Sequence, residues 1–373
     1  MDVLYSITQK ELIDNLNKME SASAVKSVLV LMTDDGICTT EFMNPLLTSF
    51  GKPIIGGVFH EIIVNSKRTE YGALLIPLYF RLQTKLMKFD EGENSTYFDQ
   101  LESQFSEKIP ESGSLFIFAD AFDTGKSSFV EGLFNFFGFK FSYVGAGCGS
   151  YAFKSFPCVI HNSGLFGNAG VIGLTVEDVS LGVSHGWLPI SNQMKVTEAK
   201  ESTVFTINWE PAYEVYKRIV EGHSGKIFTA DNFLEIAKSY PIGLVKIDGE
   251  MVVRDPIKAE NGILYFFDTI ESGQHICVLH GNIESLLSGA KRAKDKCLET
   301  LDDTEKNEGF VFCIDCFSRV KFLEDKFATE LIELSGKQMV HGALTFGEIA
   351  NVGESFLEIY NKTVIVAKWK QTI

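Results

Sequence analysis

The chain has 373 residues, of which 45% are hydrophobic, and this predicts two folded domains with sizeable cores and excludes a disordered chain. Its 34 basic and 49 acidic residues give a net charge of −15, and no cluster of Lys and Arg stands out. Nucleic acid and an anionic membrane surface are therefore poor partners. No stretch is apolar for long enough to predict membrane insertion.

The cysteines and the amino terminus predict a reducing setting. The seven cysteines are odd in number and widely spread, which argues against a disulfide framework. Residues 1–6 lack the basic start and apolar core of an export signal. We therefore expect a cytoplasmic protein.

Beyond a helix expected near 8–19, one pattern occurs three times along the chain. An apolar strand leads through a polar turn into a helix, which is followed by a strand interrupted by glycines and then by a third strand. The copies span about residues 27–80, 114–175 and 309–369. The glycines Gly56, Gly145 and Gly342 follow the strand starts at Val28, Leu115 and Phe310 by 28, 30 and 32 residues. This spacing indicates internal duplication.

Glycines at equivalent strand positions indicate backbone that bends or is approached closely. They could form a ligand-facing surface, or they could be ordinary turns at strand ends. Both interpretations remain open from the sequence.

Between the second and third copies, the chain alternates between apolar and polar residues, as in 204–209, which is typical of half-buried strands. Helices are expected from Pro211 and near 283–297, and the acidic run 302–305 reads as a linker. The polar run 221–226 marks a candidate boundary, giving domains 1–225 and 226–373. The expected fold is α/β (α+β), with repeated strand–helix–strand–strand units in mixed or antiparallel sheets and helices packed on them.

Two motifs resemble known sites only in part. Residues 120–127 end in Gly-Lys-Ser like a phosphate-binding loop, but Asp120 stands where such a loop needs glycine. A polar turn before a helix explains the run better. Cys313 and Cys316 have the spacing of a metal pair without a second pair, and on a strand they point to opposite faces, which favours buried structural thiols.

A cysteine between glycines lies in the run Gly147, Cys148, Gly149 and Ser150. Cys148 could be an exposed nucleophile with His161 or His185 as its base. Alternatively, the small residues could let a ligand approach the backbone. Any of His60, His161, His185 and His341 could be an axial haem ligand in a Phe-lined pocket, or could simply form hydrogen bonds.

Arg319 and Glu348 are the strongest candidates for ligand binding. Both follow strands of the third copy, so they should emerge at the same end of the sheet. Arg can bind a carboxylate with two hydrogen bonds and Glu can accept from an ammonium, which together suit an amino acid. Thr345 and the backbone amides of 147–150 could add hydrogen bonds. A plain salt bridge between Arg319 and Glu348 is the alternative.

At these residues the chain resembles the FIST family, named for F-box and intracellular signal transduction proteins. The resemblance covers an N-terminal and a C-terminal FIST domain over nearly the whole chain. The residues that carry it are 145–147, 171–174, 185–189, 196–199, 211–216, 312–319 and 342–350. His185 is a candidate ligand-binding residue because it lies in one of these matching stretches.

The resemblance implies a cytoplasmic sensory protein that binds a small ligand, with amino acids as the usual class. It also implies haem-based sensing of nitric oxide for some relatives. No kinase, cyclase or F-box module is recognisable in the sequence, so a separate signalling partner of kinase, cyclase or chemoreceptor type is expected. No cofactor is required. A haem sensor, an enzyme that uses Cys148 and a structural adaptor remain the alternatives.

Overall fold

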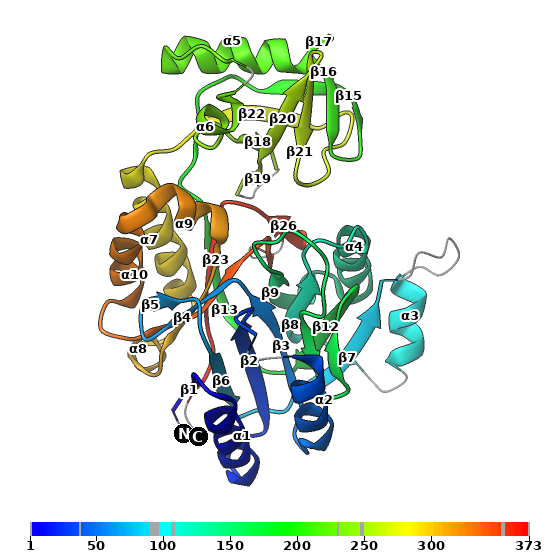
Figure 1. The fold of residues 1–373 in the computed structure, drawn as a ribbon, viewed down its shortest axis with the longest axis vertical. Coiled ribbons are helices and arrows are strands. Elements are labelled where there is room, and N and C mark those ends of the chain that lie inside the picture. The colour runs from blue at the N-terminus through cyan, green and yellow to red at the C-terminus, as the bar shows by residue number, and fades with distance from the viewer. Residues whose placement is uncertain are drawn as a thin grey trace.

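The computed structural model describes residues 2–36, 39–89, 97–105, 109–229, 231–246, 250–351 and 355–371. The chain forms two lobes (Figure 1). The larger lobe contains three six-stranded sheets, and the smaller lobe contains a nine-stranded sheet. No helix in these ranges is long and apolar enough to cross a membrane.

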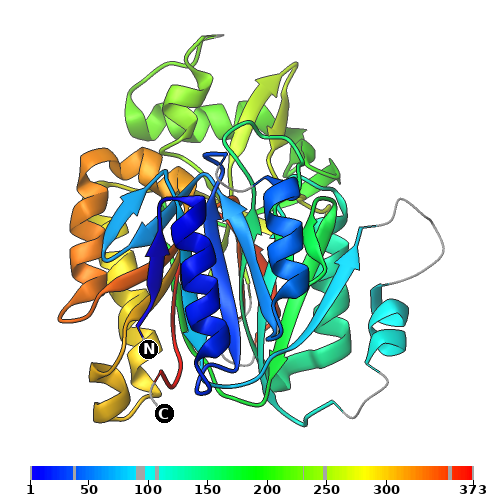
Figure 2. The same cartoon turned by 60° about the horizontal axis from the view of Figure 1, so that its bottom comes forward.

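The three sheets of the larger lobe come from three equivalent repeats. Each repeat has an edge strand, a helix, a strand, a second helical segment, a parallel strand, a hairpin and a returning strand. The first repeat consists of β1 (Leu4–Ser6), α1 (Gln9–Ser21), β2 (Ser27–Thr33), α2 (Thr40–Ser49), β3 (Ile54–Phe59), β4 (Glu61–Val64), β5 (Lys67–Thr69) and β6 (Ala73–Leu78). Figure 2 shows α1 lying across the outer face of these strands.

The second and third repeats have the same order. The second consists of β7 (Gln83–Lys88), α3 (Tyr97–Gln104), β8 (Gly113–Asp120), α4 (Gly125–Phe137), the 3₁₀ turn η1 (Gly138–Lys140), β9 (Phe141–Cys148), β10 (Val159–His161), β11 (Gly164–Phe166) and β12 (Ala169–Thr175). The third consists of β13 (Ser180–Ser184), α7 (Ile283–Glu299), α8 (Asp303–Asn307), β23 (Val311–Cys316), α9 (Phe317–Leu323), η2 (Glu324–Lys326), α10 (Phe327–Ser335), β24 (Val340–Thr345), β25 (Glu348–Ala350), β26 (Glu358–Tyr360) and β27 (Val364–Lys368).

Strand pairing confirms the predicted duplication. In each repeat the two strands that flank the second helical segment are parallel, and the returning strand pairs antiparallel with the first of them. The third repeat differs in one detail. The helix expected after the first strand of this copy is broken into α9 and α10 at Glu324, whose φ of 50° cannot continue an α-helix.

The repeats exchange their hairpins, which the sequence did not predict. The hairpin strand β4 of the first repeat pairs with β24 of the third, β25 of the third pairs with β9 of the second, and β10 of the second pairs with β3 of the first. The exchange closes a ring of three sheets. Each repeat therefore needs the other two to complete its sheet.

The three glycines occupy equivalent places in this ring, as predicted. A Cβ on Gly56, Gly145 or Gly342 would lie 1.8, 2.4 or 1.7 Å from a carbonyl oxygen of the neighbouring parallel strand. No side chain fits at such distances. The three glycines lie inside β3, β9 and β24 and not in turns at strand ends, and their role in the structure is close packing against the neighbouring strand.

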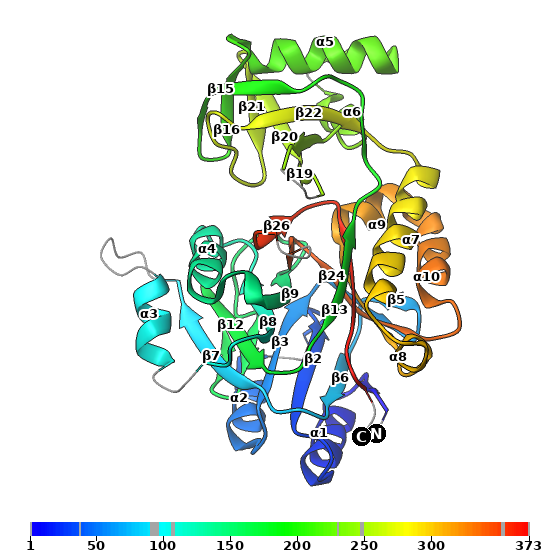
Figure 3. The ribbon, with the colours of Figure 1, turned by 180° about the vertical axis from the view of Figure 1, so that it is seen from behind.

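The smaller lobe is an insertion within the third repeat, between β13 and α7. Its elements are β14 (Leu188–Pro189), β15 (Met194–Lys200), β16 (Thr203–Ile207), β17 (Glu210–Pro211), α5 (Ala212–Ser224), α6 (Phe233–Ala237), β18 (Ile242–Leu244), β19 (Val252–Arg254), β20 (Pro256–Glu260), β21 (Ile263–Phe266) and β22 (His275–His280). Figure 3 shows the chain rising from β13 into this lobe and returning through α7.

The structure corrects two expectations about linkers. The run 221–226 is the last turn of α5 followed by Gly225, a left-handed C-cap, so the division after residue 225 falls between strands of one sheet. The run 302–305 is not a linker, because Asp302 caps α8 through a reciprocal capping box with Glu305.

Candidate functional site

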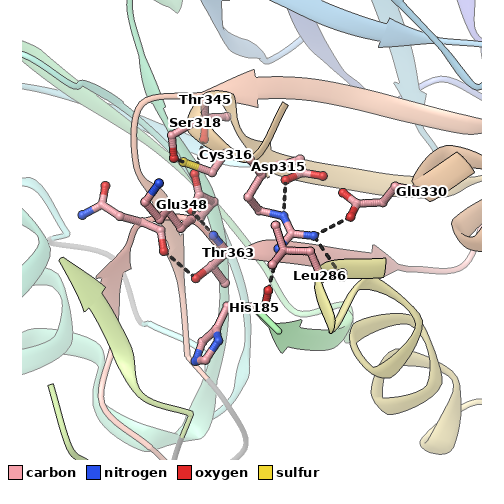
Figure 4. A network of polar contacts seen from close by, with 12 residues as sticks. His185, Leu286, Asp315, Cys316, Ser318, Glu330, Thr345, Glu348 and Thr363 are labelled. Atoms are coloured by element: carbon pink, nitrogen blue, oxygen red, sulfur yellow. Dashed lines mark hydrogen bonds and ion pairs between the residues drawn. The ribbon is translucent and has the colours of Figure 1, made fainter. Parts of the chain in front are cut away.

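Arg319 lies in α9 directly after β23 and is completely buried. Its guanidinium forms ion pairs with Asp315 at 3.1 Å and with Glu330. It also donates to the backbone carbonyls of His185 at 2.6 Å and Leu286 at 3.3 Å (Figure 4). All these partners belong to the protein, so Arg319 ties α9 to α10, α7 and the segment after β13 instead of facing a ligand.

Two acidic side chains, Asp315 and Glu330, contact the single basic side chain of Arg319. Oδ2 of Asp315 and Oε1 of Glu330 have no hydrogen-bond partner in the described ranges. Burial, followed by the charge of Glu330, raises the pKa of Asp315 well above its ordinary value. Burial opposes the charge of Arg319, but Glu330 and Asp315 outweigh it and raise the pKa of Arg319. Two buried acids thus share one guanidinium.

Glu348, the second residue of the predicted pair, begins β25 and is also completely buried. Its carboxylate accepts from the Thr345 hydroxyl at 2.8 Å and from the Thr363 amide at 3.2 Å. Burial raises the pKa of Glu348 to about 8. Within the described residues no ion pair joins it to Arg319, so the structure differs from both expectations, the amino-acid clamp and the plain salt bridge.

The glycine-rich end of β9 is packed by the protein itself. The Gly147 amide donates to the Gly347 carbonyl at 2.7 Å, and a Cβ on Gly149 would lie 2.4 Å from the Phe122 ring. Cys148 is fully buried, and burial, followed by the charge of Asp120, raises its pKa well above its ordinary value. A thiol in this state is a poor nucleophile. The Ser150 hydroxyl accepts from the Ala152 amide within its own turn.

His185 is buried between the lobes. Its Nδ1 accepts from the Trp187 amide at 2.9 Å, and its Nε2 lies 3.6 Å from Oε1 of Glu250. Burial lowers the pKa of His185 to about 4, so the ring is neutral at physiological pH. Thus Arg319, Thr345, Glu348 and His185 share one buried region, but that region is filled by protein groups.

A cleft between the two lobes is a better candidate for the ligand site, and it was not predicted from the sequence. It has a volume of about 850 Å³. Its polar lining comes from α4, from the inserted lobe and from β26, and includes Ser127, Ser128, Lys246, Glu250, Arg254 and Glu358. Volume and mixed lining are typical of small-molecule sites.

Arg254, at the end of β19, is the residue in the cleft best placed to bind an anion. Its Nε donates to the carbonyl of Thr269 at 3.3 Å, and one terminal nitrogen donates to the carbonyls of Val253 at 3.1 Å and Ile359 at 3.0 Å. The other terminal nitrogen forms no hydrogen bond among the described residues, and the Asp268 carboxylate, whose charge interacts with Arg254, lines the same cleft. Because the side chain is 93% buried and held at three points, this donor is preorganised. In sequence, Arg254 reads as the polar end of an ordinary strand.

The first turn of α4 forms the opposite wall of the cleft through Ser127 and Ser128. The Thr124 side chain does not cap this helix, but Oδ1 of Asp123 accepts from the Gly125 amide at 2.7 Å, so the Ser127 and Ser128 end of the first turn is the part that could favour an anion. The preceding turn is not a phosphate loop. Asp120 is buried and accepts from the amides of Phe122 and Asn168, so it occupies the space that a phosphate would need.

Carboxylates on the same cleft complete its charge pattern. Glu358 pairs with Lys246, and Glu250 pairs with Lys296 at 3.1 Å. Burial acts to raise the pKa of Glu250, but the nearby cationic groups outweigh it, and the net shift is downward. The cleft is therefore lined by the carboxylates of Glu250 and Glu358 as well as by the cationic Arg254.

Residues 358–363 form the seam between the lobes. The carbonyl of Ile359 binds Arg254, and the Lys362 ammonium lies 3.2 Å from Asp255. The seam connects to the Glu348 network through the Thr363 amide. A ligand bound to Arg254 would therefore contact groups that belong to both lobes.

Haem needs an axial histidine that faces an apolar cavity. Over the described ranges, no histidine lines the cleft, and the cavity beside His341 has a volume of about 330 Å³ with a mixed polar lining. Nδ1 of His341 accepts from the Asn65 amide at 3.4 Å, and His161 is hydrogen-bonded to Thr84. Neither His161 nor His341 therefore meets this requirement.

Comparison with protein families agrees with the resemblance read from the sequence. The FIST N domain matches residues 27–210, and the FIST C domain matches residues 212–351. No curated protein matches the chain. FIST domains are sensory domains of signal transduction that broadly bind small ligands. The chain belongs to the FIST family.

Proposed function

We propose that this protein senses an amino acid, or a similar small acid, in the cleft between its lobes and passes the signal to a separate partner. The observation that carries the proposal is the buried Arg254, which has one terminal nitrogen without a hydrogen bond among the described residues and lines a cleft together with Ser127 and Ser128 of the first turn of α4. Two independent donors to an anion thus line the same cleft.

The ligand carboxylate would bind between Arg254 and the first turn of α4. A guanidinium binds a carboxylate through charge-assisted hydrogen bonds, and the hydroxyls of Ser127 and Ser128 could add neutral ones. Water is largely excluded from Arg254, which strengthens such an interaction relative to one on an open surface.

The ammonium of an amino acid would be received by the carboxylates on the cleft wall, Glu250 and Glu358. Each already has a lysine partner, so a ligand ammonium would compete with Lys246 or Lys296 for these carboxylates. An organic acid without an ammonium lacks this interaction. Amino acids are therefore the preferred ligand class.

Signalling to a partner would follow from closure of the lobes over the ligand. Arg254 belongs to the inserted lobe and α4 to the ring of repeats, so one ligand would bridge both. Exposed aromatic side chains lie beside this cleft, where Phe139 and Phe356 pack on Phe134. A partner of kinase, cyclase or chemoreceptor type could read the closed state there.

A ligand screen tests the proposal directly. Native mass spectrometry and thermal shift with amino acids and organic acids identify the ligand, and a hundredfold excess over Kd should stabilise the protein by about 2.7 kcal/mol. Arg254→Lys keeps the charge but loses the fixed donor geometry, so it should weaken binding more than tenfold. Arg218→Lys, on the exposed face of α5, is the matched control and should not change affinity.

A second variant separates binding from folding. Ser128→Asp places a negative charge in the first turn of α4, which should preserve or raise stability while repelling a carboxylate. If a ligand is found and neither Arg254→Lys nor Ser128→Asp changes its affinity, the cleft is not the site.

The partner is tested by photo-crosslinking from position 356 in cells, with position 332 on α10 as the exposed control. A protein captured only from position 356, in a ligand-dependent way, supports the proposal. Equal capture from both positions contradicts it.

A further inference from the structure

The carboxyl end of β3 and the β4–β5 hairpin bring together three metal-binding side chains, away from the inter-lobe cleft. One donor atom from each of His60, Glu61 and Glu70 lies within 4.8 Å of the others. His60 and Glu61 stand where the chain leaves the first repeat to pair with the third, and Glu70 follows β5. These hairpin strands lie beside α9 and α10 in Figure 1.

Glu61 is a buried carboxylate with incomplete compensation. Its side chain is 3% exposed, and its one ion pair in the described ranges joins Oε2 to the Arg68 guanidinium at 3.6 Å, which is too long for a hydrogen bond. Oε1 has no described partner. A carboxylate removed from water in this way is unfavourable unless a cation lies against it. A bound cation would neutralise this charge.

The His60 ring is held in place by a carboxylate and by two aromatic rings. Its Nδ1 lies 3.4 Å from Oδ1 of Asp34, and a carboxylate at that nitrogen holds the proton there and leaves the lone pair on Nε2. The ring stacks on Tyr151 at 5.5 Å and meets the edge of Phe317 at 5.3 Å. These contacts fix the imidazole independently of any ion.

From this geometry we propose that His60, Glu61 and Glu70 bind one divalent transition-metal ion, with Asp34 as a positioning residue. One imidazole and two carboxylates form a donor set that Zn²⁺ accepts, and the two carboxylates balance its charge. With zinc bonds of about 2.0–2.2 Å, two donors on one ion lie at most roughly 4.4 Å apart, and the three donor atoms here lie within 4.8 Å of one another. The exposed Glu70 side chain can turn inward to meet this requirement.

Two cations compete with the metal. Arg68 forms an ion pair with Glu61. The Lys321 ammonium lies 5.3 Å from the Tyr151 ring centroid, and its positive charge also attracts the Glu61 carboxylate. Arg68 is half exposed and can swing away when an ion enters. Removing its charge should therefore raise metal affinity, an effect opposite to that of removing a ligand.

The test uses the full chain, stripped of metal and titrated with Zn²⁺ by calorimetry, and with Co²⁺ by absorption spectroscopy. One ion should bind. Glu70→Gln and His60→Gln should each weaken binding at least tenfold, Asp34→Asn by about 10- to 100-fold, and Arg68→Gln should strengthen it. Controls are Glu102→Gln and His275→Gln, which change exposed side chains elsewhere and should have no effect.

Several outcomes would overturn the proposal. The absence of stoichiometric binding is one, and unchanged affinity in Glu70→Gln is another, because it would place the ion elsewhere, for example on cysteine thiols. If His60→Gln does not fold, Glu70→Gln still decides the matter, since Glu70 is exposed and its replacement leaves the core intact. A Co²⁺ spectrum that shows thiolate charge-transfer bands would also contradict the assignment.

Discussion

Gly145 of β9 lies directly opposite Ile349 of β25, although the two residues belong to different repeats. The same relationship joins Gly56 to Ile160 and Gly342 to Ile63. In each case a glycine lies where a repeat receives the hairpin of another. The ring therefore depends on close backbone contact at three equivalent points.

Gly342→Ala should destabilise the protein strongly. The added methyl group would lie 1.7 Å from the Cys313 carbonyl, so the strands must separate, at a cost of at least about 2–3 kcal/mol. Urea unfolding measures the effect. Gly222→Ala is the control, because a Cβ there meets nothing within 4 Å and alanine favours the α5 helix. Equal effects of the two substitutions would contradict the close contact.

Arg319→Met should impair folding. It leaves the buried carboxylates of Asp315 and Glu330 without their cation, and breaking such a network costs about 3–5 kcal/mol. Chemical denaturation of the variant measures this loss. Arg218→Met removes an exposed pair with Glu210 and should leave stability unchanged. A fully stable Arg319→Met variant with lost ligand binding would restore the original ligand-clamp interpretation.

Glu348→Gln should make the protein less sensitive to alkaline pH. Burial raises the pKa of Glu348 to about 8, from 4.5 when the chain is unfolded. Between these values the unfolded state has lost a proton that the folded state keeps, so wild-type stability falls as the pH rises from about 5 to 8. The variant lacks this dependence. Unfolding free energies at pH 5 and pH 8 measure it, and an identical slope in both proteins would contradict the burial argument.

Cys148 should resist alkylation in the folded protein. Its thiol is fully buried and burial raises its pKa, so iodoacetamide at neutral pH should label it only after denaturation. Mass spectrometry of tryptic peptides measures the labelling with and without urea. Rapid stoichiometric labelling of the native protein would favour the alternative of an enzyme that uses this cysteine.

Local features of the fold could be predicted from the sequence. The apolar runs and spaced glycines indicated three strand–helix–strand–strand units, and the helix expected near 8–19 is present as α1, which Thr8 caps. These signals are local, because a capping side chain or a strand glycine acts within a few residues or on one neighbouring strand. They also led to the correct family.

The assembly of the repeats and the position of the candidate site were decided only by tertiary structure. Nothing near β4 in the sequence indicates that it pairs with β24 of another repeat. Arg319 looked exposed at a strand end, yet α10 and α7 bury it against Glu330 and Leu286. Arg254 looked like a strand end too, but insertion of a whole lobe into the third repeat carries it to the cleft. Burial of a charge depends on elements far away in sequence, and residue spacing does not contain that information.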